Sequence, residues 1–110
     1  MKAVWRIAAA AESDVAEILD YIAAKDGVTR ALAVHARFVR AFERLAAHPG
    51  LGKTRVGITG RKVRWWRVFR GMVLYEGDRR LVTILRVVHG ARDGKPYLVD
   101  DGPVLDDHAG

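Results

Sequence analysis

The chain has 110 residues, of which 50% are hydrophobic and 29% charged; its formal net charge is +6 and its mean hydropathy is -0.03. These values are typical of one small globular domain, and they exclude a second catalytic domain and a membrane-spanning segment of roughly 20 apolar residues. We expect a cytoplasmic protein, since the first residues do not resemble a signal peptide, and neither a metal site nor a cofactor, because cysteine is absent and the four histidines lack the spacing of metal ligands.

The first half of the chain predicts one strand and two helices. Residues 2–7 alternate in polarity, as a strand does, and the apolar positions that follow have the i, i+3, i+4, i+7 spacing of a helix that ends near Gly27. A second helix begins at Thr29, which we expect to cap it, and ends at residues 48–50. Its apolar side, which includes a partly buried histidine, consists of Ala31, His35, Phe38, Phe42 and Leu45.

The second half of the chain predicts a loop and three strands. Residues 49–62 contain four glycines and few apolar side chains, which indicates a long basic loop. The strands cover residues 63–69, 72–76 and 81–89, and short turns join them as antiparallel hairpins. The last strand is nearly continuous in apolar β-forming residues, so we expect it in the middle of the sheet, covered on both faces.

The predicted elements define an α+β fold in the order β-α-α-β-β-β. A helical hairpin packs on one face of a small, mainly antiparallel sheet. This single domain accounts for residues 1–99. Residues 100–110 follow it as an acidic tail that we expect to be mobile.

Basic residues concentrate in the strand-forming part of the chain. Residues 1–49 hold seven basic and six acidic side chains, residues 50–95 hold twelve basic and three acidic ones, and residues 96–110 hold four aspartates and no lysine or arginine. The middle segment therefore carries a net charge of +9. Such a segment creates a positive potential that attracts phosphate or an acidic partner, although a solvated basic surface gives the same pattern.

Short motifs follow one another in a specific order between residues 4 and 93. They include Ala-Glu-Ser-Asp-Val at residues 11–15, His-Pro-Gly-Leu-Gly at residues 48–52 and Val-Leu-Tyr at residues 73–75. The last motif is Arg-Val-Val-His-Gly-Ala-Arg-Asp at residues 86–93. In this order the motifs resemble the RelE/ParE superfamily of bacterial toxins from type II toxin–antitoxin pairs, and the last motif resembles the ParE branch in particular.

The resemblance implies a toxin that blocks growth when it is free and that a small co-encoded antitoxin, often ParD-like, neutralises in a hetero-oligomer. RelE-like members cleave messenger RNA on the ribosome, whereas ParE-like members poison DNA gyrase with no catalytic step assigned to them, and such pairs are associated with plasmid stabilisation. The partners that the resemblance implies are thus an antitoxin and DNA gyrase, with the ribosome and messenger RNA as the alternative, and no membrane.

Two positions favour the gyrase interpretation. RelE-like enzymes carry arginines where Met72 and Gly90 stand here, and neither residue can stabilise phosphate charge. Tyr97 can still serve as the C-terminal tyrosine of a RelE-like endoribonuclease, so this alternative stays open. The side chains available for such a reaction are Arg64, Arg86, His89, Arg92 and Tyr97. A third interpretation, a non-enzymatic nucleic-acid-binding module, follows from a pI of ≈ 10.2.

The predicted target-binding residues lie in the long loop, on the strand after it and beyond the last strand. Because side chains alternate along a strand, we expect an exposed face with Arg64, Trp66 and Arg70 and a core face with Val63, Trp65 and Phe69. An exposed tryptophan between arginines is suited to stacking on a base or to being covered by an antitoxin. The residues expected to contact the target are Lys53, Arg55, Arg64, Trp66, Arg70 and Arg92.

Arg86 lies inside an apolar strand, where an unpaired guanidinium is costly. Regular alternation puts it on the face of Ile84, so it either emerges on the open face of the sheet or pairs with a buried carboxylate such as Asp14. For His89 we expect a structural role in the turn that follows the strand, in preference to proton transfer. Ala8, before the first helix, offers no capping side chain.

Overall fold

The computed structural model describes residues 4–56, 62–68 and 70–89, and at residues 55 and 56 the backbone alone. The fold is α+β, and the predicted order of elements is confirmed, with one additional strand, β2. Predictions for residues 90–110, including Arg92, Tyr97 and the acidic tail, lie outside the described residues. The elements are β1 (Trp5–Ile7), α1 (Ala9–Asp26), α2 (Val28–Ala47), η1 (Pro49–Leu51), β2 (Lys53–Val56), β3 (Lys62–Val68), β4 (Gly71–Asp78) and β5 (Leu81–His89).

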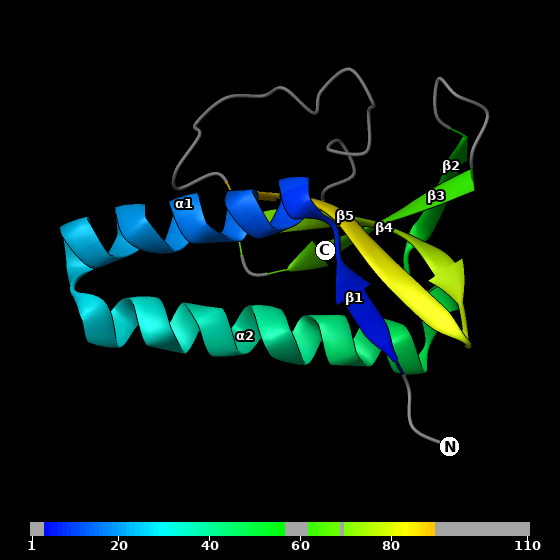
Figure 1. Ribbon diagram of the computed structural model, residues 1–110, viewed down its shortest axis with the longest axis horizontal. Helices are drawn as coiled ribbons and strands as arrows, with labels where there is room; N and C mark the ends of the chain where they lie inside the picture. Colours follow the sequence, from blue (N-terminus) through cyan, green and yellow to red (C-terminus); the bar gives the residue numbers. More distant parts are fainter. Residues whose placement is uncertain (1–3, 57–61, 69, 90–110) are drawn as a thin grey trace.

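The two helices form an antiparallel hairpin with a single residue between them (Figure 1). That residue is Gly27, whose φ of 97° lies in a region that side-chain-bearing residues rarely adopt. Thr29 therefore lies inside α2, and the prediction that it caps the helix is wrong, because the chain has already turned at Gly27. Ala8 makes no side-chain cap to α1, as expected. Within the described part of the chain, neither helix is long and apolar enough to cross a membrane.

The buried face of α2 differs from the predicted one at one position. Val34 is 1% exposed, whereas His35 is exposed to solvent, so the prediction of a partly buried His35 is wrong. Both positions fall between Ala31 and Phe38 at helical spacing. The apolar side chain takes the place in the core because burying valine is favourable and burying imidazole costs hydration.

The sheet has five strands in the order β1-β5-β4-β3-β2. Among the described strands, β1 pairs in parallel with β5, and the other neighbouring strands pair antiparallel. β5 is an interior strand, but the middle strand of the sheet is β4. The prediction that the last strand lies in the middle is therefore wrong by one position. β2 lies within the segment predicted to be a loop. Its sequence, Lys-Thr-Arg-Val, lacks a periodic apolar pattern, which is typical of an edge strand that pairs on one side only.

The core lies between the helical hairpin and one face of the sheet (Figure 1). Both helices contact β5, and α1 packs along it. The side chains that are at most 1% exposed include Ile18, Val34, Phe38, Leu45, Val73, Tyr75 and Ile84.

A bulge interrupts the pairing of β4 with β5. Tyr75 pairs with Ile84, while the preceding residue, Leu74, pairs with Arg86, so Leu85 is left without a partner in the register. The irregularity reverses the alternation along β5. Arg86 and Ile84 therefore face opposite sides of the sheet, and the prediction that they share a face is wrong.

Candidate functional site

The predicted target-binding residues do not form one exposed cluster. Lys53 and Arg70 are exposed, whereas Arg64 and Trp66 are half-buried. The side chain of Arg55 and the whole of Arg92 lie outside what the structure describes. The burial of Arg64 and Trp66 follows from their place on β3.

The pairing of β3 with β4 reverses the predicted faces of β3. Arg64 pairs with Tyr75 and Trp66 with Val73, so both lie on the sheet face that the helices cover. Trp66 packs against the core and is not an exposed aromatic residue between arginines, as was predicted. Trp65 points to the other face and is nevertheless only 6% exposed; its Nε1 has no hydrogen-bond partner among the described residues.

Arg64 and Tyr75 tie the segment around η1 to the sheet. The Tyr75 hydroxyl donates to the carbonyl oxygen of Pro49 at 2.7 Å and accepts the N–H of Gly52 at 2.8 Å. Arg64 Nη1 donates to the carbonyl oxygen of Gly52 at 3.0 Å. Burial raises the pKa of Tyr75, and the Gly52 hydrogen bond and the charge of Arg64 oppose this shift. Arg64 thus has a structural partner and is only partly available to a target.

Arg86 forms an ion pair with Asp14, as predicted. Its Nε and Nη2 donate to the two carboxylate oxygens of Asp14 at 2.8 and 2.9 Å. Asp14 Oδ2 also accepts the backbone N–H of Val87 at 2.9 Å. The pairing of β1 with β5 ends at Ile7 and Ile84. Beyond this pair, the carboxylate of Asp14 on α1 takes the place of a strand partner and accepts the N–H of Val87 on β5. Arg86 is therefore engaged within the fold.

His89 is 0% exposed and packs edge-on against the ring of Phe38, with 6.2 Å between ring centroids. A buried imidazole cannot reach a substrate phosphate, because proton transfer requires hydrogen-bond contact. Of the five predicted catalytic residues, the three that are described are thus buried or bonded within the fold. The other two, Arg92 and Tyr97, lie outside the described residues.

A groove between α2 and the end of β3 carries a cluster of arginines that the sequence analysis missed. The groove has a volume of ≈ 630 Å³. We call it the arginine groove; its lining consists of Arg37, Arg40, Ala41, Glu43, Arg44, Trp66, Arg67 and Val68. The signal was present in the sequence: three arginines at positions i, i+3 and i+7 of α2 share one helix face. The net charge of residues 1–49 did not reveal this cluster, because the six acidic residues of that segment offset most of its seven basic ones.

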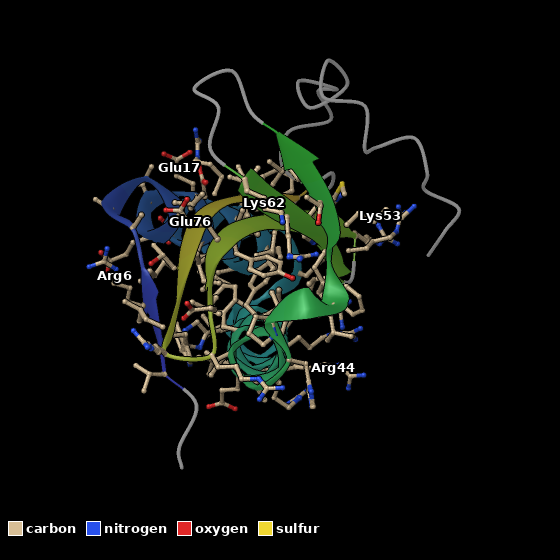
Figure 2. The ribbon with its side chains drawn as sticks, turned by 90° about the vertical axis from the view of Figure 1, so that its right-hand side faces the viewer. Arg6, Glu17, Arg44, Lys53, Lys62 and Glu76 are labelled. Carbon is tan, nitrogen blue, oxygen red and sulfur yellow. The ribbon has the colours of Figure 1, made fainter. Side chains whose placement is uncertain are left out.

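Figure 2 shows how charged side chains are distributed around this part of the molecule. Lys53 and Arg44 lie on the right of this view, Arg6 and Glu17 lie on the left, and Lys62 and Glu76 lie between them. Besides Lys62, three exposed cations lie on or next to β2 and β3: Lys53 on β2, Arg67 on β3 and Arg70 at the turn before β4. We call these three residues the cationic side.

A second groove, of ≈ 510 Å³, lies beside η1. Its charged and titratable lining residues are His48, Arg64, Asp78 and Arg79, so a carboxylate offsets part of the positive charge. Among the described residues, no group of three His, Asp or Glu side chains is placed to hold a metal ion. The arrangement of the described side chains is one that binds anionic groups.

Comparisons with known proteins agree with this architecture. A chain from the chromosomal ParDE toxin–antitoxin system of P. aeruginosa superposes with a TM-score of 0.65 at 18% sequence identity, covering 79% of this chain and 95% of that chain. At this identity the likeness concerns the fold alone. No curated protein matches the chain. The model of the family described as the ParE toxin of the type II toxin–antitoxin system, parDE, matches residues 6–94, and this match confirms the resemblance found in the motifs. The chain therefore belongs to the ParE toxin family of type II toxin–antitoxin systems.

Proposed function

We propose that this toxin inhibits bacterial growth in the cytoplasm by binding and poisoning DNA gyrase, and that a small co-encoded ParD-like antitoxin neutralises it in a hetero-oligomer. Membership of the ParE family supports the proposal. The observation that carries it is the cationic side itself, where Lys53, Arg67 and Arg70 are all exposed to solvent.

Binding without chemistry is favoured over RNA cleavage. A phosphodiester cleavage site needs a cation beside the developing phosphate charge and a group that carries the proton. Met72 stands where RelE-like enzymes carry an arginine, and His89, the imidazole nearest to the end of β5, is fully buried. An exposed cationic surface, by contrast, is sufficient for attachment to an acidic region of a large target.

A supercoiling assay with the purified toxin tests this function. Relaxed plasmid, gyrase and ATP are incubated with increasing toxin, and we expect supercoiling to fall and cleaved DNA to accumulate. Preincubation of the toxin with the product of the adjacent small open reading frame serves as the control and restores supercoiling. Unaffected supercoiling, together with transcript cleavage that depends on ribosomes, would instead establish the RelE-like alternative.

A further inference from the structure

The lining of the arginine groove holds more basic than acidic side chains. It contains four arginines and one glutamate, Glu43. Arg40, Arg44 and Arg67 are exposed and form no hydrogen bond or ion pair with any described residue. Like charges held together repel one another, and an anionic partner relieves this repulsion. The groove is therefore suited to an acidic ligand.

The groove also has an apolar wall. Trp66 is half-buried and packs against the core, and with Ala41 and Val68 it forms the apolar part of the lining. A tryptophan side chain contributes a large contact area at low entropic cost when it is already held in place. A ligand that combines carboxylates with an apolar side chain thus uses both kinds of lining.

The edge of β3 beside the groove is not covered by another described strand. β2 pairs with residues 62–65 of β3, and its register ends at the pair of Lys53 with Trp65. Trp66, Arg67 and Val68 extend beyond this pairing while remaining paired with β4 on their other side. An edge of this kind offers backbone donors and acceptors to an extended peptide.

We propose that the arginine groove binds an acidic, extended segment of the neutralising antitoxin. This segment pairs with β3 beyond the end of β2, places carboxylates against Arg40 and Arg44 and packs an apolar side chain on Trp66. The inference rests on the proposed toxin–antitoxin function. The strand edge favours a polypeptide over a nucleic acid, because a peptide backbone both donates to and accepts from a strand edge, whereas a phosphate group can only accept. The groove shares Arg67 with the cationic side, so its occupant covers part of the surface that we assign to the target.

Fluorescence anisotropy with a synthetic peptide tests the proposal on the full-length toxin. The probe is a short fluorescein-labelled peptide of alternating Glu and Val, and a matched peptide has Gln in place of Glu. We expect the toxin to bind the Glu peptide about tenfold more tightly than the Gln peptide. The double variant Arg40→Gln/Arg44→Gln weakens binding of the Glu peptide by about tenfold, since each charge-assisted contact contributes modestly at an exposed site.

The matched control is Arg79→Gln/Arg80→Gln, which removes two exposed arginines at the turn between β4 and β5. It binds the Glu peptide within about twofold of the unaltered toxin, because these side chains lie outside the arginine groove. Circular dichroism of both variants verifies that they are folded. Equal weakening by the two double variants would overturn the proposal, because it would indicate a general charge effect without a specific groove.

Two further probes distinguish the kind of ligand. A Glu-Val peptide that is N-methylated at alternate residues loses main-chain donors and binds at least about tenfold more weakly if it pairs with β3; unchanged affinity would overturn the strand pairing. If single-stranded DNA binds more tightly than the Glu peptide and its binding depends on Arg40 and Arg44 in the same way, the groove is a nucleic-acid site and the proposal is overturned. The peptide result does not depend on gyrase, so a toxin that leaves supercoiling intact contradicts the proposed function alone.

Discussion

Asp14 lies where the parallel pairing of β1 with β5 ends, and one carboxylate there binds both Arg86 and the N–H of Val87. The Asp14 side chain is 11% exposed and that of Arg86 is 49% exposed, so solvent screens part of the ion pair. The backbone N–H of Val87 donates to the same carboxylate, and Val87 is only 1% exposed. Loss of the carboxylate therefore removes both the acceptor of the Val87 N–H and the ion pair of Arg86.

We predict that Asp14→Ala lowers the free energy of unfolding by about 2 kcal/mol, as measured by urea denaturation. Asp20→Ala, at an exposed position of the same helix, is the matched control and changes it by no more than about 0.5 kcal/mol. The same change in helix propensity occurs in both variants, so their difference isolates the contacts of Asp14. Equal stability of the two variants would contradict the structural role of Asp14.

Tyr75 is the second residue whose polar atoms connect distant parts of the chain. The Tyr75→Phe variant keeps the buried ring and removes the hydroxyl that bonds Pro49 and Gly52. We predict a loss of about 2 kcal/mol in the free energy of unfolding, because two backbone groups lose their partner. Tyr21→Phe, at an exposed tyrosine, is the control and leaves the urea midpoint in place.

The same hydroxyl makes stability depend on pH in the alkaline range. Burial raises the pKa of Tyr75 above its ordinary value of about 10, so the folded state favours the neutral phenol. Its contribution is complete below about pH 10 and is lost as the pH rises through the pKa of the folded state. We predict that the stability difference between the unaltered protein and Tyr75→Phe is constant near neutral pH and shrinks above about pH 10. A difference that grows with pH in urea titrations would contradict this sign.

At the scale of elements, β5 leaves no room for a side chain at the first residue of β4, Gly71. A Cβ at Gly71 would overlap the carbonyl oxygen of Val88, which belongs to the paired strand and cannot move without breaking the ladder. We predict that Gly71→Ala lowers the free energy of unfolding by about 3 kcal/mol in urea denaturation. Gly50→Ala is the control, since nothing lies within 4 Å of a Cβ there, and it leaves stability within about 0.5 kcal/mol.

Elements with a strong periodic pattern were predictable from the sequence. The two helices and the last three strands show apolar periodicity, and their order and type are confirmed. β2 was not predictable, because an edge strand of four residues buries too little to require an apolar pattern. The bulge that leaves Leu85 unpaired was not predictable either, because alternation assumes regular pairing and a bulge depends on both strands together.

The site was less predictable than the fold, for a related reason. A residue's face on β3 depends on its register with β4, and a shift of one position exchanges the two faces. The sequence therefore identified Arg64 and Trp66 as notable residues but assigned them to the wrong face. The ion pair of Arg86 with Asp14 was predictable, because a guanidinium within an apolar strand requires a partner.

For the whole molecule, Arg64 and Arg86 bond to groups on other elements, and the cationic side is exposed to solvent, as are Arg40 and Arg44 of the arginine groove. Exposed basic residues thus lie on α2, β2 and β3, although others, such as Arg6, Arg79 and Arg80, lie elsewhere on the described surface. A molecule of this kind is expected to act by attachment, and a partner that covers the same surface silences it.

The most direct test compares supercoiling inhibition by two charge-matched double variants, Lys53→Gln/Arg70→Gln on the cationic side and Arg79→Gln/Arg80→Gln at the turn between β4 and β5. The measured quantity is the toxin concentration that halves gyrase activity. We predict that half-inhibition requires about tenfold more of the first variant, while the second variant matches the unaltered protein, because only the first removes charge from the surface that we propose for target binding. Equal potency of the first variant and the unaltered toxin would contradict the account.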